Sequence, residues 1–166
     1  FCTGEEGYFN GDAIRGQGGW KTVNGGTTWA QLAATNGANF NACQKIIVTS
    51  TGVVMVATST GLRRSTDGGT TWTKVLGAGL GITGAVNNLC YDVDIAANGD
   101  VYASLYGSVH KSTTSGATWG AAQTLGITAS RIELACAPSD ANYVYALVEN
   151  ANVVAGFLRT VNGGTT

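Results

Sequence analysis

One eight-residue segment recurs four times along the chain, and this repetition constrains the fold more than any other feature. The copies begin at residues 22, 65, 112 and 160 of the 166-residue sequence, so their spacings are 43, 47 and 48 residues. The clearest copy reads Ser65-Thr-Asp-Gly-Gly-Thr-Thr-Trp72. Each copy directly follows a basic residue, namely Lys21, Arg64, Lys111 or Arg159. A period in the forties is typical of units built from four short strands, and it is too long for a leucine-rich or ankyrin unit.

The residues between the copies read as short strands separated by turn residues, such as Asn98-Gly99. No segment sustains the 3.6-residue periodicity of a helix. We therefore predict an all-β fold, specifically a β-propeller segment of about 3.6 four-stranded blades of about 46 residues each. The expected strands are 45–49, 53–58, 62–65 and 71–75 in the second period, 89–96, 100–105, 109–112 and 118–121 in the third, and 131–135, 143–148 and 155–160 in the fourth. The expected blades are 1–35, 36–82, 83–128 and 129–166, the last being incomplete.

The repeated segment carries the residues of a tight turn between the third and fourth strands. Its glycine pair reaches backbone φ values that are closed to other residues. A Ser or Thr hydroxyl, with Asp or Asn two positions later, can accept hydrogen bonds from the N–H groups of the turn. The tryptophan is expected to begin the fourth strand and to bury its ring against neighbouring strands. These structural positions are Thr22, Asn24, Gly26 and Trp29; Ser65, Asp67, Gly69 and Trp72; Ser112, Gly116 and Trp119; and Thr160, Asn162 and Gly164.

These segments resemble the Asp-box, also called the BNR repeat, whose pattern is Ser/Thr-x-Asp-x-Gly-x-Thr-Trp. The copy at 65–72 fills every position, whereas Asn24, Thr114 and Asn162 replace the Asp elsewhere and the third copy has Ala117. The segment 137–146 is also similar to a hairpin common in sortilin-like and xyloglucanase-like propellers. The resemblance implies a β-propeller of the kind found in sialidases, the sortilin luminal domain, two-propeller xyloglucanases and the photosystem II assembly propeller. Because these activities are unrelated, the resemblance specifies architecture more than function.

The number of repeats predicts a segment of a longer propeller, because propellers commonly close with about 4–8 blades. The fourth copy reaches Thr166, and the pattern places a tryptophan next. We therefore expect this blade to pack against further blades, supplied by the same longer chain or by another copy.

Charge and composition exclude several classes of function. Nine Lys and Arg residues against ten Asp and Glu residues give a net charge of −1, which suits neither a nucleic-acid-binding domain nor an acidic disordered tail. No apolar run approaches the roughly 18 residues that span a bilayer. The four cysteines form no CxxC pair, so we expect no zinc site and no cofactor. Low charge and an even cysteine count favour an exported protein, secreted, at the cell surface or periplasmic, in which three disulfide connectivities are open.

Two carboxylates, Asp92 and Asp94, form the best candidate for chemistry. They share one face of a predicted strand, because the side-chain period of a strand is two. If that strand is the innermost of its blade, both line the central channel, where an inverting glycosidase would need two carboxylates roughly 6–10 Å apart. The partners open to them are Glu5, Glu6 and Asp12. We favour the alternative, that both carboxylates are solvated or make structural hydrogen bonds.

Other residue types indicate no catalytic site. The arginines are scattered, whereas a sialidase gathers them around the substrate carboxylate. The string from Asp92 to Asp100 resembles a calcium loop but lacks the required ligand spacing. His110, the only histidine, is expected to be exposed or partly packed. The arginines are Arg15, Arg63, Arg64, Arg131 and Arg159, and the aromatic residues open to a binding role are Tyr8, Phe9, Trp20, Tyr106 and Tyr143.

Together these features favour a non-catalytic, exported β-propeller whose rim loops or central channel bind a protein or glycan partner. The alternative is a glycoside hydrolase, xyloglucanase-like or sialidase-like, whose catalytic carboxylates lie partly outside this segment. An assembly factor for a photosynthetic complex would present an arginine-rich face, which five scattered arginines do not predict.

Overall fold

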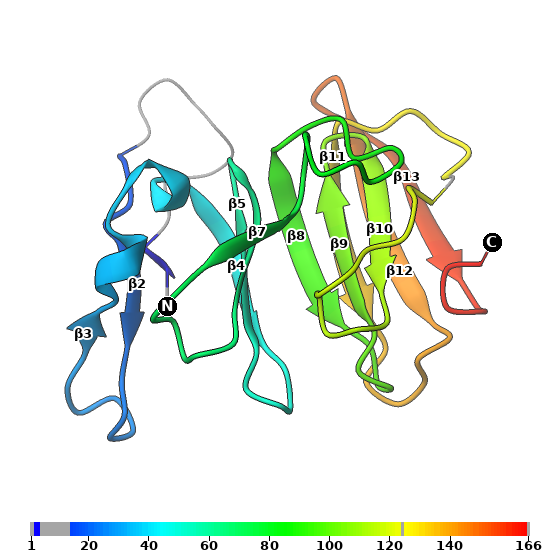
Figure 1. Ribbon diagram of the computed structural model, residues 1–166. Helices are drawn as coiled ribbons and strands as arrows, with labels where there is room; N and C mark the ends of the chain where they lie inside the picture. The colour runs from blue at the N-terminus through cyan, green and yellow to red at the C-terminus, as the bar shows by residue number, and fades with distance from the viewer. Residues whose placement is uncertain (1, 4–13, 124, 166) are drawn as a thin grey trace.

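The computed structural model describes residues 2–3, 14–123 and 125–165, and within them the chain is all-β. Four antiparallel sheets follow one another along the chain and stand side by side (Figure 1). The first sheet contains β1 (Cys2–Thr3), β2 (Gly18–Lys21) and β3 (Ala30–Gln31), and the second contains β4 (Cys43–Val48), β5 (Val54–Thr58), β6 (Gly61–Ser65) and β7 (Thr73–Leu76). The third contains β8 (Cys90–Ile95), β9 (Val101–Leu105) and β10 (Ser108–Ser112), and the fourth contains β11 (Arg131–Cys136), β12 (Val144–Asn150) and β13 (Val153–Thr160).

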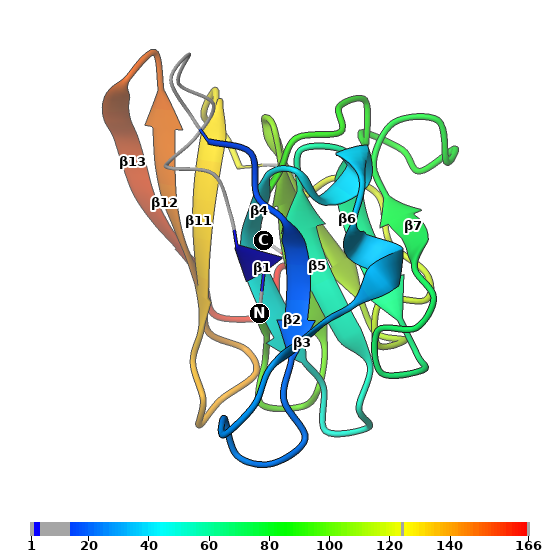
Figure 2. The ribbon, with the colours of Figure 1, turned by 90° about the vertical axis from the view of Figure 1, so that its left-hand side faces the viewer.

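Each sheet is a meander in which neighbouring strands are consecutive in sequence, which is the arrangement of a propeller blade. The all-β prediction and the propeller fold are confirmed. Two short 3₁₀ turns, η1 (Ala33–Thr35) and η2 (Ala38–Phe40), connect the first sheet to the second. The helices in the described part of the chain are far shorter than a membrane crossing requires. In the turned view of Figure 2, β4 and β11, the first strands of their sheets, appear near the middle, and the other strands of the two sheets extend to opposite sides.

The apolar core lies between successive sheets. Between the second and third sheets, Leu62 and Leu76 pack against Val93 and Leu105, and all four are fully buried. Between the third and fourth sheets, Tyr102 packs with Ile132 and Val148. Burial of one such aliphatic side chain contributes about 1.5–3 kcal/mol to folding. A sheet is therefore stabilised largely by the sheet beside it.

The fourth strand predicted after Trp119 differs from the structure. Residues 118–121 belong to no strand, and this part of the chain makes a single bridge, between Val109 and Gln123. In the second sheet, by contrast, β7 begins one residue after Trp72 and pairs with β6 along its length. The segment after Trp119 carries Gly120 and alanines, which have low β-propensity, so a continuous strand is not favoured there.

The tryptophans are also less buried than their place in the repeat predicts. Trp29 is 41% exposed, while Trp72 and Trp119 are half-buried. The indole N–H of Trp72 donates to the Gly69 carbonyl at 3.0 Å, and that of Trp119 donates to the Gly116 carbonyl at 3.2 Å. The ring of Trp72 also packs edge-on against Phe40. These rings therefore cover the turns that precede them.

The repeated turns share one hydrogen-bond pattern. In each, the first hydroxyl accepts from the N–H of the glycine four residues later, as in the bond from Gly69 to Ser65 Oγ at 2.9 Å. The equivalent donors are Gly26, Gly116 and Gly164, at 2.9, 2.9 and 3.0 Å. The third residue then accepts from an N–H farther along the turn. Thr114, which departs from the pattern, still accepts from the Thr118 N–H at 2.9 Å through its hydroxyl.

Asp67 has the most complete set of these bonds. Its carboxylate accepts from Ser65 Oγ at 2.8 Å, and from the N–H and hydroxyl of Thr71 at 2.9 and 2.6 Å. The hydrogen bonds from Thr71 and Ser65 lower the pKa of Asp67 to about 2.

We predict that Asp67→Ala lowers the midpoint of thermal unfolding by a few degrees, and that Asp67→Asn lowers it less, because Asn24 and Asn162 already hold equivalent turns.

The stabilisation by Asp67 depends on pH. Since the pKa of Asp67 in the folded protein lies below the usual 3.8, the carboxylate stabilises the fold above pH 3.8 and loses this effect as the pH falls toward about 2. Thermal melts of the wild type and both variants between pH 2 and 7 measure this. A wild-type advantage over Asp67→Ala that persists unchanged at pH 2 would contradict it.

Candidate functional site

The acidic pair of β8 lies where three sheets meet. β4, β8 and β11 are the first strands of the second, third and fourth sheets, and each contacts the next. Asp92 and Asp94 alternate along β8 and so share a face, as the sequence predicts. The structure brings Lys45 of β4 and the backbone of β11 to this face.

Asp92 is almost completely buried, with 1% of its surface exposed. Its Oδ1 accepts from the Val93 N–H at 2.8 Å and lies 2.9 Å from Lys45 Nζ, while Oδ2 accepts from the Leu134 N–H at 2.7 Å. Burial raises the pKa of Asp92, and the bonds from Lys45 and Leu134 act against this rise. Asp92 therefore joins three sheets: its own, the one before through Lys45, and the one after through Leu134.

Asp94, two residues farther along β8, makes a similar contact with β11. Its Oδ2 accepts from the Cys136 N–H at 2.7 Å, so both carboxylates connect β8 to β11. Burial lowers the pKa of Lys45, but its hydrogen bond to Asp92 and the charges of Asp92 and Asp94 outweigh this effect, and the net pKa is raised. Lys45 therefore stays protonated, and its positive charge offsets the negative charges of the carboxylates. The groups suggested as acidic partners, Glu5, Glu6 and Asp12, lie outside the described residues.

Burial disfavours the thiolate form of the cysteines near this site. Burial, together with the charge of Asp94, raises the pKa of Cys136 to about 12, and burial also raises the pKa of Cys90. Both are free thiols, so none of the three two-bridge connectivities open from the sequence is formed in this structure.

His110 is fully buried, so the expectation of an exposed or partly packed side chain is wrong. Ring Nε2 lies 3.1 Å from Ser108 Oγ, and Nδ1 lies 3.0 Å from the Gly120 carbonyl oxygen. Burial lowers its pKa, although the bond to Gly120 opposes this. The ring anchors the segment after the third turn to β10.

The arginines of the described chain do not converge on one point. Arg63 donates to Asn39 Oδ1 at 2.7 Å, Arg131 pairs with Glu133 at 3.0 Å, and Arg159 lies over the ring of Tyr143 at 5.8 Å. No group of metal-binding side chains occurs among the described residues, and Asp100 of the calcium-loop-like string pairs with Lys111. Of the aromatic candidates, Tyr106 is 46% exposed, whereas Tyr8 and Phe9 lie outside the described residues.

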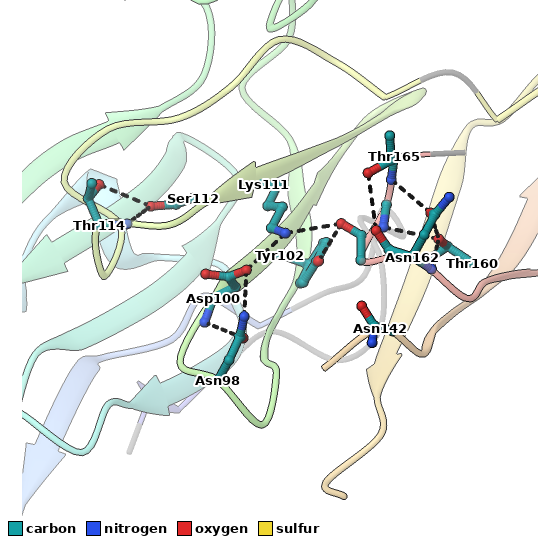
Figure 3. Close-up of polar contacts among 12 residues, drawn as sticks. Asn98, Asp100, Tyr102, Lys111, Ser112, Thr114, Asn142, Thr160, Asn162 and Thr165 are labelled. Carbon is teal, nitrogen blue, oxygen red and sulfur yellow. Dashed lines mark hydrogen bonds and ion pairs between the residues drawn. The ribbon is translucent and has the colours of Figure 1, made fainter. Parts of the chain in front are cut away.

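The basic residues before the first three repeated turns have a role that the sequence marks by position but does not reveal. Lys111 Nζ donates to the Gly163 carbonyl of the next turn at 3.1 Å, and the Tyr102 hydroxyl donates to the same oxygen at 2.8 Å (Figure 3). Asp100 lies 2.8 Å from Lys111 Nζ and holds the ammonium in place. This cluster fixes the fourth turn onto the third sheet.

A groove of about 680 Å³ lies between the outer parts of the third and fourth sheets. Half of its lining residues are aliphatic, among them Val109, Leu134, Val144 and Leu158, and the others include Tyr145 and Arg159. At one edge Gln123 donates to the Gly164 carbonyl at 2.6 Å. Its volume lies within the roughly 300–1,000 Å³ common for ligand pockets. Sequence reasoning does not find this groove, because it depends on how two sheets diverge.

We predict that Asp92→Asn lowers the free energy of unfolding by about 2–4 kcal/mol. The amide has one oxygen and cannot accept from Val93, Leu134 and Lys45 together, and the Lys45 ammonium loses its ion pair. Asp94→Asn keeps an acceptor for Cys136 and should cost less than about 1 kcal/mol. Chemical denaturation of the two variants beside the wild type tests this. Equal losses for both variants would show that Asp92 does not have the central role assigned to it.

Comparison with known proteins supports the architecture. No family model matches this chain, and no curated protein matches it. Among solved structures, the Niastella koreensis GH74 enzyme is similar with a TM-score of 0.66 and 21% identity, over 89% of this chain and 25% of that one. An ancestral GH74 enzyme is similar with a TM-score of 0.58 and 20% identity, over 84% of this chain and 19% of that one. This chain thus spans a quarter or less of these structural neighbours, with which it shares the β-propeller fold.

Proposed function

We propose that this chain is a non-catalytic module of an exported β-propeller that binds a partner protein. The observation that carries the proposal is the use of Asp92 and Asp94: both carboxylates accept backbone N–H groups of β11, and Asp92 is also paired with Lys45. An acid or base catalyst must exchange a proton with a substrate within hydrogen-bonding reach. Asp92 is too buried to do so, and Asp94 is committed to the sheet beside it.

The groove between the third and fourth sheets supports a binding role. Its aliphatic lining suits the apolar side chains of a peptide, and Gln123 at its edge offers polar contacts. Sugars are commonly held on aromatic faces, and the lining of this groove has more aliphatic residues than aromatic ones, with Tyr145 as the aromatic member. We therefore favour a protein partner over a glycan. Export is supported by the low charge of the sequence, 11% of positions.

The alternative is that the chain forms part of a glycoside hydrolase. Its support is the likeness in fold to two structures named as GH74 enzymes, of which this chain spans at most a quarter. In that case a catalytic pair would include at least one carboxylate from outside this segment.

We predict that the chain hydrolyses none of a panel of xyloglucan, other β-glucans and sialylated glycans. Reducing-end and free sialic acid assays measure this. Turnover that disappears in Asp94→Asn, with its fold verified by circular dichroism, would overturn the non-catalytic proposal.

Binding is tested with a displayed peptide library and a glycan array, both probed with the intact chain. We predict that selected peptides carry apolar side chains and lose at least about tenfold in affinity in Leu158→Glu, because a charge then enters the groove. Val153→Glu, on the same strand but 63% exposed and outside the groove lining, is the matched control and should bind normally. Selective binding to the glycan array, unaffected by Leu158→Glu, would refute a peptide-binding groove.

A further inference from the structure

Four asparagines in the described part of the chain are directly followed by glycine. The pairs are Asn24-Gly25, Asn36-Gly37, Asn98-Gly99 and Asn162-Gly163, and a fifth, Asn10-Gly11, lies outside the described residues. Such a pair can change without an enzyme, because the glycine nitrogen can attack the side-chain amide carbon of the asparagine and close a five-membered ring. Glycine has no Cβ to hinder this attack. Whether the ring closes in a folded protein depends on how firmly each pair is held.

Two of the asparagines are held by paired side-chain hydrogen bonds. Asn24 Oδ1 accepts from the Thr28 N–H at 3.0 Å, and its Nδ2 donates to Thr28 Oγ1 at 2.8 Å. Asn98 Oδ1 accepts from the Asp100 N–H at 3.0 Å, and its Nδ2 donates to Asp100 Oδ2 at 2.9 Å. Ring closure at either site must first break both bonds.

The glycine nitrogens of the turns are also engaged. The Gly163 N–H donates to the Asn142 carbonyl at 3.0 Å, and the Gly99 N–H donates within its own turn at 2.9 Å. Asn162, before Gly163, accepts through Oδ1 from the Thr165 N–H at 3.1 Å. The turn geometry thus keeps the attacking nitrogen and the amide carbon of each pair in place.

Asn36 is held differently. It lies with Gly37 between η1 and η2, which connect the first sheet to the second, and both residues are exposed. The Asn36 side chain makes no hydrogen bond to any residue that the structure describes. The Gly37 N–H makes a bond of short range, to the Thr35 carbonyl two residues earlier at 3.1 Å, and a Cβ added to Gly37 would meet nothing within 4 Å. Asn98 is exposed as well, so hydrogen bonding, and not exposure, separates the two sites.

The residues on either side of this pair are fixed. Thr35 is buried, and its Oγ1 accepts from the Gly19 N–H of β2 at 2.7 Å. Phe40 is buried and packs edge-on against Trp72. The short exposed segment between them can therefore rearrange while the two sheets keep their places.

We propose that Asn36 converts to aspartate and isoaspartate in the folded protein, while the turn asparagines remain amides. The Gly37 nitrogen loses its proton and bonds to Asn36 Cγ, the bond from Cγ to the amide nitrogen breaks, and ammonia leaves. Water then opens the ring at one of its two carbonyls. One opening gives aspartate, and the other gives isoaspartate, in which the main chain runs through the side-chain carbon. Either product adds a negative charge to the connection between the first and second sheets.

Peptide mapping by mass spectrometry tests this, because each conversion adds about 1 Da to its peptide. The intact chain is incubated at mildly alkaline pH, which favours the deprotonated glycine nitrogen. We expect Asn36 to convert about tenfold or more faster than Asn24, Asn98 and Asn162, since ring closure there breaks side-chain hydrogen bonds. In strong denaturant those bonds are lost, and the four sites should convert within about threefold of one another.

Gly37→Ala is the matched variant. The φ of Gly37 is 176°, an extended backbone that alanine also adopts, so the fold is retained. The added Cβ should slow conversion of Asn36 about tenfold. An unchanged rate in this variant would overturn the proposal, because water would then be hydrolysing the side chain directly. Equal rates at Asn36 and Asn98 in the folded chain would also overturn it, as would an Asn36 that converts in denaturant but not in the folded chain.

Discussion

Hydrogen bonds from side chains of one sheet to the backbone of the next are the interactions on which this structure depends. A small antiparallel sheet has little stability by itself and must cover its apolar faces. The aliphatic residues between the sheets provide that cover, but the hydrophobic effect has no direction and cannot fix the angle between two sheets. The bonds of Asp92 and Asp94 to β11 hold one edge of the junction, and that of Lys111 to Gly163 holds the other.

This use of charge shapes what the molecule can do. The central ionisable groups hold the sheets together. Lys45 and Asp92 form an ion pair across two sheets, and Asp100 forms an ion pair with Lys111. A catalytic centre instead needs groups whose protonation can change during turnover. The binding role that we propose therefore rests on shape and apolar contact at the groove between the third and fourth sheets.

The sequence predicts the local features of this fold well and its junctions poorly. The strands of the second period and the turn chemistry around Asp67 follow from residues that are near one another in the chain. The partner of Asp92 lies 42 residues away on another sheet, so it depends on the packing of two units. His110 is misjudged for the same reason, because its burial comes from the segment that folds back from Gly120. The basic residues before the turns are visible as a pattern, but their acceptors are backbone atoms, which leave no mark in the sequence.

Because the acceptors are main-chain carbonyls, the residue that supplies one can change without loss of the bond. Gly68, Ser115 and Gly163 differ in side chain, yet each accepts from the sheet before it. For this one contact, a unit needs to retain only a cation on one side and a turn of the right shape on the other. The junction therefore tolerates side-chain changes at the acceptor position, in contrast to the matched apolar packing between the same sheets.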